Sequence, residues 1–159
     1  MKKSFFLSLL LTFLTTFNVW SQHSFRFHDG KFRIAQFTDI HWNAKSANCK
    51  QTSAIIQKVI QTEKPDIAIL TGDIVTEQPA DEGWKSIIQI FENSHLPFVV
   101  VMGNHDAEVM SKKEIYQQLT ASPYYAGGIG AANITGYGNC SIPIYSSNKS
   151  SNQPAALIY

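Results

Sequence analysis

The sequence predicts an α/β fold in which three strands of a parallel sheet alternate with two helices. Three short apolar runs, rich in β-branched and aromatic residues, predict the strands and span residues 32–37, 67–70 and 98–102. Helix-like stretches at residues 53–62 and 82–93 separate these runs. This order predicts right-handed crossovers and a sheet whose strands all end along the same edge.

Each predicted strand and helix has its own local signal in the sequence. The first run stops at Phe37, where polar residues begin, and the helical stretch after it groups its apolar residues on one face. The second run is apolar throughout and is followed by a stretch with the same helical grouping. The third run, ending at Met102, is again continuously apolar. The core-facing helix residues are Ile55, Ile56 and Val59 in the first helix, and Ile87, Ile88 and Phe91 in the second.

Polar residues follow each predicted strand, at the edge where open α/β sheets bind ligands. The three clusters are Asp39-Ile40-His41, Gly72-Asp73 and Gly103-Asn104-His105-Asp106. The candidate metal ligands among them are Asp39, His41, Asp73 and Asn104. Such a set of carboxylate, imidazole and amide groups suits Mn, Fe or Zn better than ions that prefer thiolates. The sequence therefore predicts a metal site at this edge of the sheet.

A carboxylate can bridge two metal ions, and Asp73 is the candidate for that role. Two divalent ions roughly 3.5–4 Å apart would clamp a phosphoryl group and activate a bound water at neutral pH. For the four candidate ligands, the alternative is an ordinary polar turn at a strand end. For His105 and Asp106, the alternative is a helix cap with a structural histidine. Hydrolysis of a phosphoester is the function that this ligand set predicts.

In order and spacing, Asp-x-His, Gly-Asp and Gly-Asn-His-Asp resemble the signatures of the calcineurin-like metallophosphoesterases, over roughly residues 30–110. The resemblance implies a layered α/β sandwich, of which only the amino-terminal β-α-β-α-β half would be present. It implies a two-metal phosphatase, phosphodiesterase or nuclease in which a metal-bound hydroxide attacks phosphorus. It also implies that Asp39 and His41 bind one ion, that Asp73 bridges, and that Asn104 binds the second ion.

The histidine after Asn104 has a different role in this resemblance. His105 would protonate the leaving group, and the adjacent Asp106 would orient its ring. Purple acid phosphatases within the family carry tyrosine and glycine at the positions of Thr76 and His41. The chain is therefore similar to the non-purple branch of Icc-like and Dcr2-like phosphatases, and no iron-tyrosinate colour is expected.

One part of the family pattern is absent from this sequence. The family uses further histidines downstream, one single and one pair in a Gly-His-x-His motif, whereas residues 107–159 contain none. Residues 155–159 resemble the start of another strand. We therefore expect residues 31–159 to be the amino-terminal part of a longer domain. The alternative is a non-catalytic truncated remnant that binds metal weakly or does not fold independently.

The amino terminus has the form of a secretory signal peptide. Lys2 and Lys3 precede an apolar run at residues 5–17, and the residues before position 22 fit cleavage after Ser21. The alternative is an uncleaved membrane anchor. Such an anchor needs about 20 apolar residues to span the bilayer, more than the run at residues 5–17 contains. We expect a signal peptide at 1–21, a short leader at 22–30 and the phosphoesterase domain at 31–159. The protein would then be exported, periplasmic or extracellular, without a stable membrane anchor after cleavage.

The charge balance and the cysteine content of the sequence limit which binding partners and which disulfide are expected. Removing Lys2 and Lys3 from 13 basic residues leaves 11 against 12 acidic ones, so no basic field favours nucleic acid. A small phosphoester is the expected substrate, of undetermined class. Cys49 and Cys140 either pair, as an exported chain permits, or are two unrelated thiols. The glycine-rich segment 121–141 is either a loop over the active site or a turn-rich connection.

Overall fold

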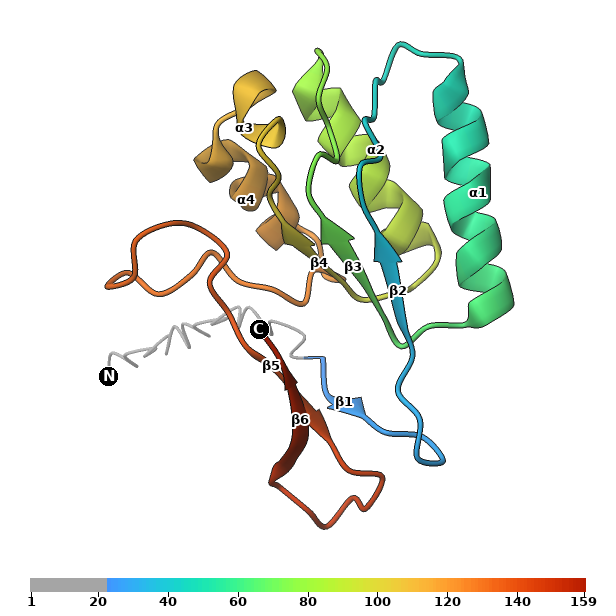
Figure 1. Cartoon of the computed structure of the whole chain (residues 1–159), viewed down its shortest axis with the longest axis vertical. Helices are drawn as coiled ribbons and strands as arrows, with labels where there is room; N and C mark the ends of the chain where they lie inside the picture. Colours follow the sequence, from blue (N-terminus) through green and yellow to red (C-terminus); the bar gives the residue numbers. More distant parts are fainter. Residues whose placement is uncertain (1–22) are drawn as a thin grey trace, which may run out of the picture.

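Three parallel strands form the central sheet of the structure, a computed structural model that describes residues 23–159. The strands are β2 (Ile34–Phe37), β3 (Ile67–Thr71) and β4 (Phe98–Val101), paired in the order β2-β3-β4. Between them run α1 (Asn48–Glu63) and α2 (Ala80–Asn93), as Figure 1 shows. The predicted parallel β-α-β-α-β unit is confirmed, although both helices begin before their predicted first residues.

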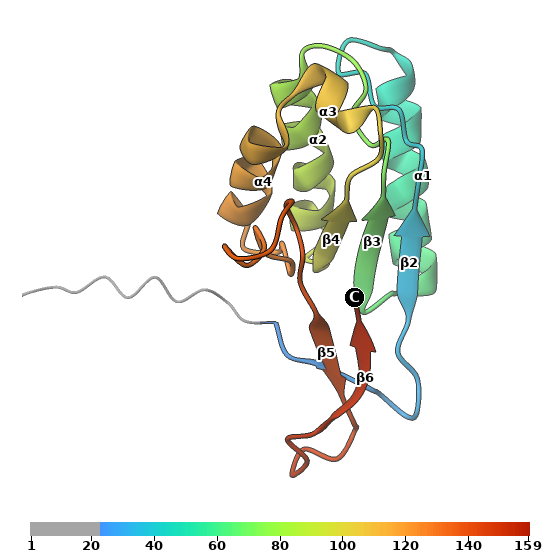
Figure 2. The ribbon, with the colours of Figure 1, turned by 60° about the vertical axis from the view of Figure 1, so that its left-hand side comes forward.

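Helices cover one face of this sheet. α1 and α2 lie there with α4 (Lys112–Ala121), which follows the short helix α3 (Asp106–Val109) (Figure 2). Alternate strand residues point toward these helices. They are Ala68, Leu70, Phe98 and Val100, in one core with Trp84 and Phe91. The rings of Phe91 and Phe98 stack with centroids 5.0 Å apart, and full burial of each contributes about 1.5–3 kcal/mol, which fixes α2 on β4.

Local signals determine where the helices begin and end. α4 begins with a capping box, in which the side chains of Ser111 and Glu114 bond each other's backbone N–H groups. α1 ends at Glu63, and its C-cap, Lys64, takes a left-handed conformation with φ of 47° and donates its N–H to the Ile60 carbonyl at 3.0 Å. The left-handed residue reverses the chain, so β3 can start three residues later, at Ile67.

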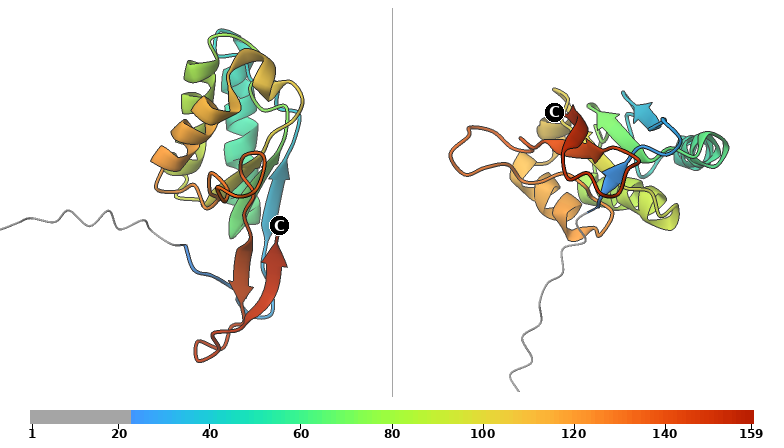
Figure 3. Two further views of the ribbon diagram at one scale, coloured as in Figure 1. Left: turned by 90° about the vertical axis from the view of Figure 1, so that its left-hand side faces the viewer. Right: turned by 90° about the horizontal axis from the view of Figure 1, so that it is seen from below.

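A second sheet, which the sequence analysis did not predict, packs on the opposite face. β1 (Phe25–Arg26) pairs in parallel with β5 (Ile142–Tyr145), and β5 pairs in antiparallel with β6 (Pro154–Ile158). Figure 3 shows this sheet at the end of the molecule opposite α3. Its apolar cluster consists of Phe25, Ile67, Val99, Ile142 and Ile144. The layered α/β arrangement is thus confirmed, and the strand expected at residues 155–159 corresponds to β6.

The second sheet leaves part of the central sheet uncovered. The register places Ile34 of β2 and Val101 of β4 on the same face as Val99. Val101, at the carboxyl end of β4, is 56% exposed, whereas Val99 is buried under the second sheet. Ile34, at the start of the edge strand β2, is 46% exposed. The carboxyl ends of the strands, which carry the polar clusters, lie at the end of the central sheet away from β5 and β6 (Figure 2).

The predicted signal peptide at residues 1–21 lies outside the described residues, as does residue 22 of the leader. The described remainder of the leader, residues 23–30, contains β1 and pairs with β5. From residue 23 onward, no helix has both the length and the apolar character that crossing a membrane requires.

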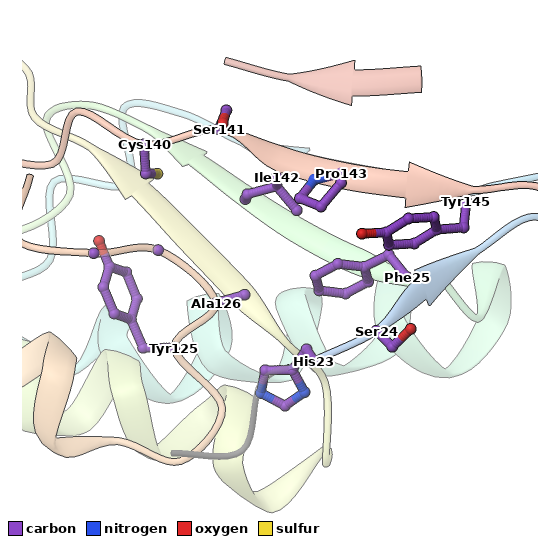
Figure 4. Close-up of a pocket in the computed structure, with 12 residues that line it drawn as sticks. His23, Ser24, Phe25, Tyr125, Ala126, Cys140, Ser141, Ile142, Pro143 and Tyr145 are labelled. Atoms are coloured by element: carbon purple, nitrogen blue, oxygen red, sulfur yellow. The ribbon is translucent and has the colours of Figure 1, made fainter. Parts of the chain in front are cut away.

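The two cysteines lie in different parts of the structure, and both are free. Cys140 is exposed and lines a cavity of about 420 Å³ next to β1 and β5, together with Tyr125 (Figure 4). Cys49 lies in the first turn of α1, where its thiol contacts the carbonyl oxygen of Asn43. Of the two alternatives, the structure shows unrelated thiols and no disulfide.

The glycine-rich segment at residues 121–141 connects α4 to β5. Figure 2 shows it beside β4, below the strand ends that carry the polar clusters. Gly138 has a φ of 81°, and an added Cβ there would overlap the hydroxyl of Tyr116. These features favour a turn-rich connection over a loop that covers the active site.

Candidate metal centre

Backbone pairing continues beyond the ends of β2 and β3 and aligns two of the polar clusters. The N–H of Asp39 bonds the Gly72 carbonyl at 3.0 Å, and the N–H of His41 bonds the Asp73 carbonyl at 3.0 Å. The N–H of Trp42 then bonds the Ile74 carbonyl at 2.8 Å, and both of these side chains are buried. The two loops therefore run side by side, and their polar side chains project from the same edge.

Two aspartates and one histidine in these loops share an unusual backbone conformation. Asp39, His41 and Asp73 have φ of 51°, 47° and 52°, in the left-handed region. Few residues other than glycine adopt this region, although asparagine, aspartate and histidine do so more often than most. The conformation costs free energy and persists only when surrounding contacts enforce it, as the paired loops do here. Such strain is often found at functional sites.

The left-handed turns bring three potential ligands together. One ligand atom each from Asp39, His41 and Asp73 lies within 4.8 Å of the others. His41 Nε2 is 3.9 Å from Asp39 Oδ1, and these side chains are 52% and 64% exposed. Two carboxylates and an imidazole are hard and intermediate donors that fit a divalent ion such as Mn, Fe or Zn. Because Asp39 and His41 are exposed, an ion can reach them from solvent.

Two glycines allow the loops after β3 and β4 to touch. Gly72 has a φ of 93°, and an added Cβ there would lie 2.8 Å from the Gly103 Cα atom. A Cβ on Gly103 would overlap both the backbone nitrogen and the carboxylate of Asp73. Asn104, the predicted ligand of a second ion, is exposed on the same loop next to Gly103. Its role as a ligand stays a prediction.

Asp106 connects the loop after β3 to the loop after β4 through hydrogen bonds from within the core. Its side chain is fully buried, and its carboxylate accepts four backbone hydrogen bonds. The donors are the N–H groups of Gly103 at 2.8 Å, Asp73 at 2.9 Å, Ile74 at 2.8 Å and Val75 at 3.0 Å. These contacts fix the backbone of the Asp73 loop against the end of β4. Asp106 is therefore the structural anchor of the Asp73 carboxylate.

This arrangement corrects the predicted partner of His105. The carboxylate of Asp106 is occupied by backbone donors, whereas His105 Nδ1 lies 2.9 Å from Glu108 Oε2. The backbone N–H of His105 bonds Asp73 Oδ1 at 3.0 Å, which ties the histidine to the metal cluster. Glu108 was not among the predicted site residues. Its spacing of three residues from a histidine at a helix start was the available signal.

The Glu108 carboxylate also changes the acidity of the histidine. Its hydrogen bond and its negative charge together raise the pKa of His105 above the ordinary value of 6.5, with smaller contributions from the charges of Asp73 and Asp106. The His105 ring lies 6.2 Å from the His41 ring, centroid to centroid. An imidazole that holds its proton more tightly than a free histidine therefore lies beside the ligand cluster.

Comparison with known proteins identifies this arrangement. Residues 32–151 match the family described as calcineurin-like phosphoesterase, and this range contains every polar cluster described above. The chain belongs to the calcineurin-like phosphoesterase family. Phosphoester hydrolysis with divalent metal ions is the general activity of this family, and the Asp39, His41 and Asp73 cluster fits it.

Relatives of this chain occur in fungi and plants. An uncharacterized protein of Schizosaccharomyces pombe is 29% identical over 126 residues, covering 67% of this chain and 24% of that protein. "Probable inactive purple acid phosphatase 29" of Arabidopsis thaliana is 26% identical, covering 82% and 39% respectively. "Phosphatase DCR2" of Saccharomyces cerevisiae is 24% identical, covering 76% and 25%. The chain therefore spans about a quarter to two fifths of these relatives. No solved structure matches it significantly.

Removing the Glu108 charge is expected to lower the pKa of His105 toward 6.5. Glu108→Gln loses the carboxylate that stabilises the imidazolium, so the protein should bind the His105 proton less tightly. NMR titration of the His105 ring in metal-free protein measures this pKa. Glu63→Gln, at the far end of α1, is the matched control. An unchanged His105 pKa in Glu108→Gln would contradict the assignment.

Proposed function

We propose that this chain contributes the metal-binding and proton-donating residues of an exported phosphoester hydrolase. The single observation that supports this most is the meeting of Asp39, His41 and Asp73 ligand atoms within 4.8 Å at the strand ends of the family's sheet. The substrate would be a small phosphoester, either a monoester or a diester. Nothing in the near-neutral charge balance favours nucleic acid.

Each residue of the cluster has a proposed role in this reaction. Asp39 and His41 would hold one divalent ion, Asp73 would share it with a second ion, and Asn104 would ligate that second ion. Such ions supply charge stabilisation for the phosphoryl oxygens and activation of water. Mn, Fe and Zn all suit these donors. The hydrogen bond from the His105 N–H to Asp73 keeps the histidine next to the proposed metal ligands.

His105 would donate a proton to the departing alcohol oxygen. Its Nδ1 faces Glu108, so the opposite nitrogen, Nε2, is the one available to the substrate. In the metal-free chain Glu108 raises the pKa of His105, so this carboxylate helps the ring to keep its proton as pH rises. Hydrolysis should therefore decline as pH rises through this raised pKa, where the acid becomes unprotonated.

Hydrolysis of an aryl phosphate monoester and an aryl phosphate diester with added Mn tests the proposal. Asp73→Asn removes a charged ligand while keeping the shape, and we expect it to abolish both metal binding and hydrolysis. Asp81→Asn, which alters an exposed carboxylate of α2 paired with Lys85, is the matched control and should behave as wild type. Isothermal calorimetry with Mn supplies the binding measurement independently of turnover.

The outcomes separate two functions. Metal binding with hydrolysis that Asp73→Asn abolishes supports the hydrolase. Metal binding by a folded chain that hydrolyses neither ester supports a non-catalytic, metal-binding chain, a second candidate favoured by the exposure of two of the three ligands, Asp39 and His41. A folded chain that binds no metal contradicts both. Amino-terminal sequencing of protein recovered outside the cytoplasm tests export, with Gln22 as the expected first residue.

A further inference from the structure

The backbone pairing that aligns the metal ligands extends to one more polar residue. After the His41 N–H bond to Asp73, residues Trp42 and Val75 form a parallel bridge. Both of these side chains are buried, at 6% and 0% exposure, and they pack into the core beneath the loops. Ile74, on one side of Val75, is buried as well. His41 and Thr76, which flank the bridged pair, are instead exposed and partly exposed, respectively.

The side chains of His41 and Thr76 contact each other. Thr76 Oγ1 lies 3.3 Å from His41 Nδ1. The other ring nitrogen, His41 Nε2, faces Asp39, with 3.9 Å between Nε2 and Oδ1. The two nitrogens of this imidazole therefore have separate partners, a hydroxyl on one side and the ligand cluster on the other.

The separate partners of the two ring nitrogens matter because a histidine binds a metal through an unprotonated nitrogen. The remaining nitrogen then carries hydrogen, and a hydrogen-bond acceptor at that position fixes the ring orientation and the tautomer. A threonine hydroxyl can accept such a bond. We infer that Thr76 is a positioning residue for His41, accepting the Nδ1–H bond so that Nε2 faces the metal. The inference rests on the proposed metal centre.

A cavity beside the pair offers a matched control. His41 and Thr76 line a hollow of about 360 Å³, and Thr52 in α1 lines the same hollow. Thr76→Val removes the hydroxyl at nearly constant shape, Thr76→Ser retains it, and Thr52→Val makes the same chemical change without a contact to His41. The three variants therefore separate the loss of the hydroxyl from a general change in the hollow.

Zinc binding to the purified chain, measured by isothermal calorimetry, tests the inference without turnover. Loss of such an outer hydrogen bond typically weakens metal affinity by about 10–100-fold, and we expect this for Thr76→Val. Thr76→Ser and Thr52→Val should stay within about threefold of wild type. NMR of the zinc-loaded protein should show a His41 Nδ1–H proton that exchanges with solvent faster in Thr76→Val than in wild type.

Each possible result either supports or overturns the positioning role of Thr76. Equal zinc affinity in Thr76→Val and wild type overturns the inference while leaving the metal centre intact. An equal loss of affinity in Thr52→Val also overturns it, because the hollow rather than the hydroxyl would then control binding. If wild type binds no zinc, the proposed metal centre fails and the positioning role fails with it. Thermal unfolding of the metal-free variants should be unchanged, since the contact is exposed.

Discussion

Replacing Asp106 with alanine is expected to lower the free energy of unfolding by roughly 3–5 kcal/mol. The buried carboxylate accepts four backbone hydrogen bonds, and two of the donors, the N–H groups of Ile74 and Val75, belong to fully buried residues. Each buried donor left without an acceptor costs about 1–3 kcal/mol. Water that enters the site hydrogen-bonds some of these donors and so recovers part of that cost. Urea unfolding followed by circular dichroism measures the change.

Two further variants make the Asp106 result interpretable. Asp106→Asn keeps the shape of the side chain but points an amide group, itself a donor, at two of the backbone donors, so we expect most of the loss to remain. Asp81→Ala removes an exposed carboxylate whose ion pair with Lys85 contributes little, about 0.3–0.5 kcal/mol. A loss below about 1 kcal/mol in Asp106→Ala would show that the loops do not depend on this anchor.

Replacing Gly103 with alanine is expected to disrupt both folding stability and the metal site. The new methyl group would overlap the backbone nitrogen and the carboxylate of Asp73, and backbone cannot move aside as a flexible side chain does. We expect the free energy of unfolding to fall by about 3 kcal/mol. Because Asp73 is displaced, metal affinity should fall more than tenfold, as for other disturbed ligand environments.

A second glycine supplies the control for Gly103→Ala. An added Cβ on Gly128 would meet nothing closer than the backbone nitrogen of Gly130, at 3.8 Å. Gly128→Ala should therefore leave both the urea midpoint and the zinc affinity near wild type. Wild-type zinc affinity in Gly103→Ala, measured by calorimetry, would mean that the loops separate without moving the ligands, contrary to the tight packing described above.

The central sheet could be predicted because its information is local. Each of β2, β3 and β4 is a short apolar run with polar residues immediately after it, and parallel pairing follows from the intervening helices. The same reasoning placed Asp39, His41 and Asp73 at neighbouring strand ends, where the structure brings them together.

The second sheet could not be predicted in this way. β1 contains two residues, Phe25 and Arg26, too few to show any periodicity, and its partner β5 lies more than a hundred residues further along the chain. The role of Asp106 was missed for a related reason. Asp106 was expected to orient a side chain, that of His105, whereas its carboxylate accepts hydrogen bonds from backbone N–H groups, which every sequence contains.

The left-handed backbone at Asp39, His41 and Asp73 restricts how these positions can evolve. A replacement there must satisfy the φ of about 50° as well as any chemical requirement. Glutamate could ligate an ion, and valine or threonine could fill the space, but none of them adopts this conformation readily, whereas asparagine and glycine do. In a lineage that gave up its ion, the first substitutions tolerated here would therefore be asparagine or glycine, and the turns would outlast the ligands.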